Sequence, residues 1–361
     1  MIASITLSSR RRGRGRGLHR IVTIVRSRPL QILLEYCFLG SVIWIYQLYL
    51  QSTIEFPSNN ESLIFGQHQL HSRTFSKPQI KNNPKAQIWL ALGSLETRLG
   101  NNMFQYAAII GIMARYNGPN NLKLCVHPHS PLHLLEETFV GPLQLNKCSD
   151  VVLSSMEDIP EWGYATFQDF VIPPCPGKLC AFTIKGYFQS FKYFQDCCSR
   201  TIHSIYTFKT EIEQKAVATM KSSSSPIKVG IHVRKGDMKK QGFYLRDPPM
   251  SYYQNAMEYF TDLYGSIQYI VASDDPDWVE QQPLFQGSTI LRNNNAPVDF
   301  AILASCHHVI MSRGTFGWWA AWLSGGKAIY YKHTFVMEHD ENRGKVKLED
   351  YFLPTWVSMD A

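Results

Sequence analysis

The feature that most constrains this fold is a regular alternation of short apolar strands and helices from Ile227 onward. The predicted strands are residues 227–233, 268–272, 289–291, 308–311 and 327–331. The helices predicted between them include residues 298–305 and 315–323. This alternation is typical of a parallel sheet with right-handed crossovers, so an α/β fold is expected for the C-terminal part of the chain.

The first of these strands carries polar residues toward its carboxyl end. Its apolar residues alternate, which predicts a half-buried strand with one face formed by Ile227, Val229, Ile231 and Val233. The other face carries His232 and Arg234, and Gly236 then allows a turn before Asp237. Arginine offers a fixed fork of donors that matches phosphate oxygens, which suits an anionic ligand. An edge strand with a solvated polar face explains this stretch equally well on its own.

Three polar segments far apart in the sequence are expected at one sheet edge. Ligands of open parallel sheets bind beyond the carboxyl ends of the strands. That rule places Arg234, Asp274 and Gly314-Thr315 together. An arginine, a carboxylate and a helix start at one edge indicate a nucleotide site. The arginine and the helix start would bind phosphate oxygens, and the carboxylate would bind ribose or base.

The N-terminal half begins with a second pattern of the same kind. Ala86–Leu92 is predicted to be a buried strand, followed by a loop over residues 93–100 and an apolar helix that Asn101 opens as its N-cap. This arrangement is compatible with an anion or hydroxyl site, and also with a simple capped core helix. The aromatic segment Lys185–Phe194 is compatible with an acceptor pocket or with core packing. Residues 222–226, Ser-Ser-Ser-Ser-Pro, are predicted to link two lobes.

The net charge of +7 is confined to the N-terminal tail. Residues 1–29 hold eight arginines and no acidic residue, so the rest of the chain has 28 basic residues against 29 acidic ones. The body is therefore close to neutral, and no nucleic-acid partner is expected. An RNA-binding tail would need a cytosolic body.

A 21-residue apolar run, Leu30–Leu50, follows this tail. About 20 apolar residues span a bilayer, and Trp44, Tyr46 and Tyr49 gather at one end as at a membrane interface. The positive-inside rule leaves the tail cytosolic, so a single type II anchor with a lumenal body is predicted. Residues 51–85 are predicted to form a stem, with an Asn60-Glu61-Ser62 glycosylation triplet.

The cysteines also suit a lumenal body. Outside the predicted anchor there are seven, an odd number, so at least one should be free or paired between chains. Cys175 and Cys180 flank a Pro-Gly turn and are candidates to bridge each other or their neighbours. No zinc-type spacing occurs.

Four segments together resemble the α-1,2-fucosyltransferases of glycosyltransferase family 11. They are Leu99–Ala107 (LGNNMFQYA), Gly186–Ser190 with Lys192–Phe194 (GYFQS and KYF), His232–Asp237 (HVRKGD) and Ser312–Gly325 around GTFGWWAA. With Ser273-Asp274-Asp275 they span about residues 86–330. Their order and spacing make the resemblance specific.

This resemblance implies a GT-B-like pair of Rossmann-type lobes behind an N-terminal transmembrane helix. The implied N-terminal, acceptor-side lobe is 86–225 and the implied GDP-fucose-binding lobe is 226–361. It implies a Golgi enzyme that transfers L-fucose from GDP-β-L-fucose, with inversion, to the 2-hydroxyl of a galactose residue. No cofactor or metal is expected, although Asp275-Pro276-Asp277 has the form of a metal-binding D-x-D. A homodimer remains open.

The resemblance also assigns roles to residues. Arg234 is implied to stabilise the departing GDP, and Asn101 to lie beside the reaction centre. Asp237 is a candidate general base, or a turn residue. The implied donor contacts are His232, Arg234, Asp274 (to guanosine), Gly314, Thr315 and Phe316.

Lys235 replaces the usual second arginine of the signature, which keeps the charge but loses the bidentate fork. Thr97 and Asn102 also depart from the family pattern. The alternative function is a non-catalytic Golgi glycan-binding or assembly subunit that retains the fold. The acceptor glycan cannot be read from the sequence.

Overall fold

The computed structural model describes residues 85–93, 98–116, 122–221, 225–236 and 244–361, all within one compact unit, 75–361. None of the helices in these described ranges is both long enough and apolar enough to cross a membrane. The predicted anchor, stem and glycosylation triplet lie outside the described residues.

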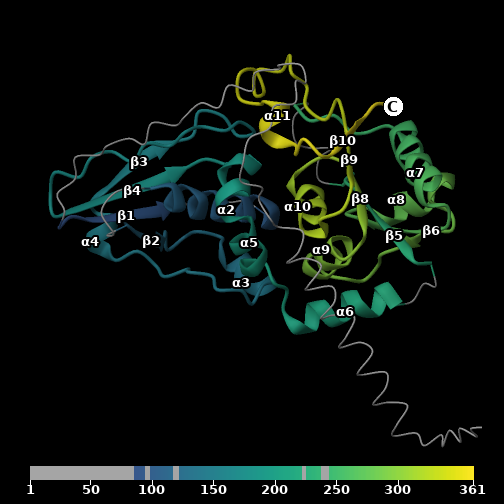
Figure 1. Cartoon of the computed structure of the whole chain (residues 1–361), viewed down its shortest axis with the longest axis horizontal. Helices are drawn as coiled ribbons and strands as arrows, with labels where there is room; N and C mark the ends of the chain where they lie inside the picture. Colours follow the sequence, from purple (N-terminus) through teal and green to yellow (C-terminus); the bar gives the residue numbers. More distant parts are fainter. Residues whose placement is uncertain (1–84, 94–97, 117–121, 222–224, 237–243) are drawn as a thin grey trace, which may run out of the picture. The chain divides into compact units, whose positions relative to one another are not determined.

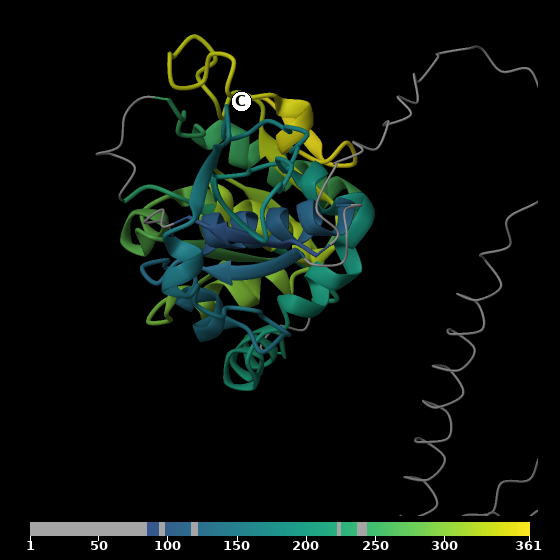
Figure 2. The same ribbon diagram turned by 90° about the vertical axis from the view of Figure 1, so that its left-hand side faces the viewer.

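The first sheet has four parallel strands in the order β2-β1-β4-β3 (Figure 1). The strands are β1 (Gln87–Leu92), β2 (Leu122–Val126), β3 (Met156–Pro160) and β4 (Leu179–Lys185). The helical segments of this half are α2 (Leu99–Arg115), α3 (His133–Thr138), α4 (Asp150–Leu153), η1 (Phe191–Tyr193), α5 (Gln195–Ile205) and α6 (Thr210–Lys221). Figure 2 views the fold from the side of this sheet.

The second sheet has six parallel strands in the order β10-β9-β8-β5-β6-β7. They are β5 (Ile227–Val233), β6 (Ile267–Ser273), β7 (Thr289–Ile290), β8 (His308–Met311), β9 (Ala328–Tyr331) and β10 (Val357–Met359). Its helical segments are α7 (Met250–Tyr264), α8 (Pro276–Glu280), η3 (Pro283–Phe285), α9 (Ala296–Ala304), α10 (Thr315–Ser324) and α11 (Leu348–Tyr351). The predicted α/β fold with parallel pairing is confirmed.

The expectation that β5 is half buried is wrong. Every residue of β5 after Ile227 is buried, including His232 on the face predicted to be polar. Helix α9 packs against β5, and α7 packs against the neighbouring strands β6 and β8. Parallel sheets are covered by helices on both faces, so the central strand has no solvated side.

One continuous core joins the two sheets. Helices α2 and α10 pack together, and Figure 1 shows them side by side between the sheets. Phe104 of α2 lies between Trp318 and Trp319 of α10, with ring centroids 4.5 and 4.9 Å away. Aromatic pairs of this kind bury large apolar areas, so the starts of these helices are held firmly in place.

The C-terminal segment packs back onto the first half of the chain. Asp350 of α11 accepts hydrogen bonds from Thr166 Oγ1 (3.0 Å) and the Phe167 amide (2.8 Å), and its carboxylate pairs with Lys192 Nζ (2.5 Å). Burial opposes ionisation of Asp350, but these donors outweigh it and lower its pKa. Residues near 350 therefore help to fix the segment around residues 186–194.

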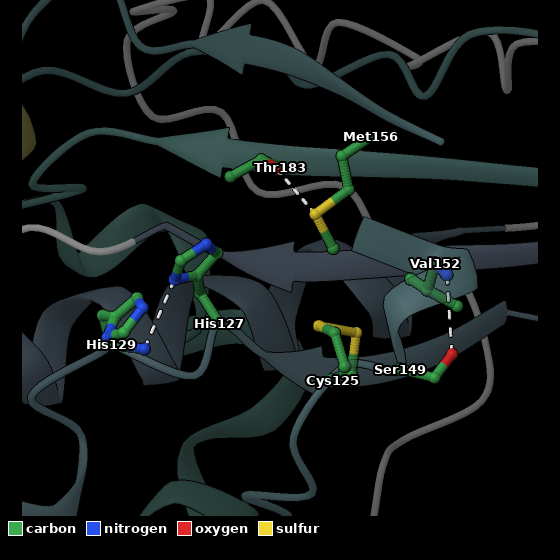
Figure 3. The surroundings of a disulfide bond; sticks show 8 residues. Cys125, His127, His129, Ser149, Val152, Met156 and Thr183 are labelled. Atoms are coloured by element: carbon green, nitrogen blue, oxygen red, sulfur yellow. Dashed lines mark hydrogen bonds between the residues drawn. A yellow bond between two sulfur atoms is a disulfide. The ribbon is translucent and has the colours of Figure 1, made fainter. Parts of the chain in front are cut away.

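Two disulfides stabilise the first half. Cys125 at β2 bonds to Cys148 across 23 residues within a small buried cluster, and Figure 3 shows the surroundings of this bond. Cys175 bonds to Cys180, one of the pairings that the sequence suggested. The adjacent Cys197 and Cys198 form a third pair. The odd cysteine predicted from the count is Cys306, which is free and buried.

Candidate functional site

The carboxyl ends of β5 and β6 bring a positive and a negative side chain together. These strands pair in register, with Val233 opposite Ser273, so the residues that follow each strand are neighbours. Arg234 Nε lies 3.3 Å from Asp274 Oδ2, and both side chains are only partly exposed. The predicted meeting of these two residues at one sheet edge is confirmed.

Asp274 also fixes the turn after β5. Its Oδ1 accepts hydrogen bonds from the amides of Lys235 (2.7 Å) and Gly236 (3.0 Å). Burial alone would raise the pKa of this carboxyl, but the two amides and then the Arg234 charge outweigh it, so the pKa falls below its usual value. Asp274 is therefore ionised and holds Arg234 in a single orientation.

His232 lies beneath this edge as a neutral, buried side chain. Its Nδ1 is 3.1 Å from Ser312 Oγ, and its ring lies 5.3 Å from that of Phe316 on α10. Burial, followed by the nearby Arg234 charge, lowers the pKa of His232 to about 3. Only 4% of the residue is exposed, which favours an orienting role over direct contact with a ligand.

The start of α10 meets the start of α2. Gly314, the N-cap of α10, adopts a φ of 86°, a left-handed value that favours glycine. A Cβ at Gly100 of α2 would lie only 2.6 Å from Thr315 Oγ1, so glycine is needed for this close approach. Two helix N-termini, each the positive end of a helix dipole, therefore converge on one place.

Asn101 joins three segments of the chain. Its Oδ1 accepts a hydrogen bond from Thr315 Oγ1 (2.8 Å) and another from Gln189 Nε2 (3.1 Å). The prediction that Asn101 is an N-cap is wrong, because α2 begins at Leu99 and is preceded by Arg98 as its N-cap. The asparagine side chain is used for tertiary contacts through Oδ1.

The loop that carries Gln189 is strained, and hydrogen bonds to Glu161 and Gln105 hold it in place. Phe188 has a φ of 53°, an uncommon value for a bulky residue. Its amide donates to Glu161 Oε2 at 2.8 Å, and the Gly186 carbonyl accepts from Gln105 Nε2 of α2 at 3.0 Å. Strain of this kind persists only where surrounding contacts enforce it, and it clusters at functional sites.

Sequence reasoning missed Glu161. Burial raises the pKa of its carboxyl from 4.5 to about 8, although the Phe188 amide favours the charged form. No local pattern marks this residue, which follows β3. Its contact with the loop of Gln189 is visible only in the structure, because β3 pairs with β4 and places Glu161 against Gly186. A Cβ added at Gly186 would lie 2.4 Å from the Glu161 Cβ.

Arg313 was also missed. It lies two residues after the end of β8, is 6% exposed, and donates from Nη1 to the Leu245 carbonyl at 3.3 Å. Its Nε is buried without a hydrogen-bond partner among the described residues. This buried guanidinium, which has an unused donor, adds positive charge beside the sheet edge that carries Arg234 and Asp274.

The remaining predicted residues are accounted for in different ways. Lys235 pairs with Asp247 at 2.5 Å and lies 4.1 Å over the Trp278 ring, so its charge has partners within the chain. Asp237 lies outside the described residues.

The D-x-D segment has structural roles. Asp275 caps α8 by accepting from the Trp278 amide (3.1 Å), and the exposed Asp277 pairs with Arg292 (2.8 Å). Across the part of the chain that the structure describes, no cluster of three or more potential metal ligands occurs.

Comparisons with known proteins place the sequence of this chain in a family. The family model described as Glycosyl transferase family 11 matches residues 62–360. Galactoside alpha-(1,2)-fucosyltransferase 2 of Rattus norvegicus is 27% identical over 365 residues, which cover 93% of this chain and 96% of that protein. Galactoside alpha-(1,2)-fucosyltransferase 1 of Sus scrofa is 33% identical over 181 residues, covering 44% of this chain and 48% of that one.

Among solved structures, that of POFUT1 in complex with GDP is similar over 67% of this chain and 95% of that one, with 11% identity and a TM-score of 0.41. A likeness this distant supports no statement about the present site.

Proposed function

Since the chain belongs to glycosyl transferase family 11, we propose that it is a galactoside α-1,2-fucosyltransferase. It transfers L-fucose from GDP-β-L-fucose to the 2-hydroxyl of a galactose residue on a glycan. The observation that carries this proposal is the meeting of Asn101, Gln189 and Thr315, because three segments of the family resemblance supply the three partners. The names of the mammalian relatives support the same activity and acceptor class.

The proposed reaction is a single displacement at C1 of fucose. The galactose 2-hydroxyl oxygen forms a bond to C1 while the bond from C1 to the β-phosphate oxygen breaks. The bonding electron pair passes to the phosphate, the hydroxyl proton is lost, and the configuration inverts from β to α. Negative charge therefore develops on the departing GDP, where preorganised donors lower the barrier most.

Arg234 is the proposed donor of positive charge at that point. Its guanidinium is oriented beforehand by Asp274, so it does not need to reorganise as the charge develops. In this proposal Asp274 acts mainly by orienting Arg234, since three of the roughly four acceptor sites of its carboxylate are used within the chain. Neutral His232 supports the edge from beneath.

The first turn of α10 supplies the second part of the proposed donor site. Gly314, Thr315 and Phe316 present the helix start, and its free amides suit phosphate and sugar oxygens. Asn101 is held against Thr315 and is proposed to lie beside the reacting sugar. Asp237 remains the proposed general base.

The proposal needs no metal ion. The charge that a divalent cation supplies elsewhere is provided here by Arg234 and the helix start. The two carboxylates of the D-x-D segment already cap α8 and pair with Arg292.

We further propose a type II Golgi membrane protein with a lumenal body. The disulfides Cys125–Cys148 and Cys175–Cys180 support this location, because such bonds persist in oxidising compartments.

The test uses the full chain purified in detergent. Incubation with GDP-fucose and a β-galactoside should release GDP and yield an α-1,2-fucosylated product, with or without EDTA. Absence of transfer across a broad acceptor panel would contradict the enzyme. GDP-fucose binding without transfer would instead favour the glycan-binding subunit.

A further inference from the structure

The loops that follow β3 and β4 expose aromatic side chains to solvent. Eight large hydrophobic residues of the described ranges are exposed, and only two of them are aromatic. These are Trp162, 81% exposed, and Tyr187, 39% exposed. Exposed aromatic rings of this kind offer apolar surface that a bound ligand can cover.

Strand pairing places the backbone segments that carry these two aromatic residues side by side. β3 and β4 are parallel and in register, with Pro160 opposite Lys185. Trp162 and Tyr187 each lie two residues beyond that pair. The preceding residues, Glu161 and Gly186, are in direct contact.

More polar groups surround Tyr187. Its ring lies 6.3 Å from that of Tyr164 in an edge-on arrangement, and the Tyr164 hydroxyl donates to Asn342 Oδ1. Asn342 also donates from Nδ2 to the Tyr244 carbonyl at 2.6 Å, so this residue links the segments that carry Tyr164 and Tyr244. Tyr187, Tyr164 and Tyr244 are therefore connected by a chain of direct contacts.

The same loop is anchored to the reaction centre. Two residues after Tyr187, Gln189 donates to Asn101, and the Gly186 carbonyl accepts from Gln105 one turn further along α2. The position of the Tyr187 ring is thus fixed relative to Asn101 through short, hydrogen-bonded connections.

We propose that Trp162 and Tyr187, flanked by Tyr164 and Tyr244, bind the terminal galactose of the acceptor glycan. Galactose has an apolar face of C–H groups that stacks on aromatic rings, while its hydroxyls suit tyrosine and carboxylate groups. This inference rests on the proposed function and names the residues that select the acceptor. We call these four residues the aromatic platform.

The test compares single variants of the full chain at saturating GDP-fucose. Tyr187→Ala and Trp162→Ala should each lower kcat/KM for a β-galactoside about five- to tenfold through a higher acceptor KM. The KM for GDP-fucose should stay unchanged, and Tyr187→Phe should restore stacking and most of the activity. Leu263→Ala, at an exposed apolar residue of α7, serves as the matched control and should behave like the wild type.

Acceptor kinetics within about twofold of wild type for both alanine variants would overturn the platform. A changed oligomeric state with unchanged acceptor KM would overturn it in favour of a self-association surface. If the wild type shows no transfer at all, the proposed function fails separately. The platform is then tested by NMR saturation transfer from the protein to a β-galactoside, and it fails if Tyr187→Ala leaves that signal unchanged.

Discussion

The donor side and the acceptor side of the proposed active site differ in how their side chains are paired and exposed. On the donor side, the side chains of Arg234 and Asp274 pair with each other and the Thr315 hydroxyl donates to Asn101. On the acceptor side, Trp162 and Tyr187 remain exposed. A preorganised edge suits a fixed ligand such as a nucleotide sugar, whereas exposed rings suit a sugar at the end of varied glycans. The chemistry is therefore expected to depend on the first region and the choice of acceptor on the second.

The Arg234→Ala variant should have the largest effect and tests the donor side directly. The departing phosphate would lose its positioned donor, and the transfer rate should fall about 10²–10³-fold, measured as GDP release with acceptor present. Arg234→Lys keeps the charge but loses the fork and should fall in between. Arg292→Ala removes a surface arginine paired only with Asp277 and Glu280, and should leave the rate near wild type. A near-normal rate for Arg234→Ala would refute the donor-side assignment.

Asp274→Asn tests whether this carboxylate acts through Arg234. An asparagine oxygen can still accept from the Lys235 and Gly236 amides, but it no longer pairs with the guanidinium as a charge. The expected result is a kcat about tenfold lower, with little change in the KM for GDP-fucose. A higher donor KM with kcat preserved would instead support the sequence-based assignment of Asp274 to guanosine.

Glu161, on the acceptor side, should make the stability of the folded chain depend on pH. Its carboxyl pKa rises from 4.5 to about 8 on folding, so the folded chain keeps a proton that the unfolded chain loses. Stability should therefore fall as pH rises through this window, by the linkage of proton binding to folding. Glu161→Gln removes the titration, and the difference in Tm between pH 5 and pH 8.5 should shrink by roughly 5 °C. Equal Tm shifts for wild type and Glu161→Gln would show that Glu161 is not protonated in the fold.

The smallest effect is expected at the D-x-D segment. Asp277→Ala should leave kcat within about twofold of wild type, since this exposed carboxylate only pairs with Arg292. Asp275→Ala should cost about 1 kcal/mol of stability through the lost cap, measured by urea unfolding, with transfer retained in EDTA. Loss of activity in EDTA that Mg²⁺ or Mn²⁺ restores would overturn the metal-free proposal.

Much of the second sheet could be predicted from local pattern. The strand over residues 308–311 was placed at its observed bounds, and the helix beginning at Thr315 starts where expected. Periodicity reveals such elements because strand and helix repeats are local properties of the chain. The short strand β10 and the helix α7 were not predicted. The buried face of β5 was misjudged, because which helices cover a sheet depends on packing of distant segments.

The candidate site also has a part that the sequence predicts and a part that only the tertiary structure shows. The sequence by itself predicted Arg234, Asn101, Asp274 and Thr315 as site residues, and it predicted the parallel strands that carry some of them. Only the tertiary structure showed that Asn101 accepts from Gln189 and Thr315, partners 88 and 214 residues away, instead of capping its helix. It alone placed Glu161 under the strained Phe188 and gathered the aromatic platform. Local preference fixes which residues form strands and helices, but the pairing of polar groups is decided by which chain segments pack together, and that is a property of the whole fold.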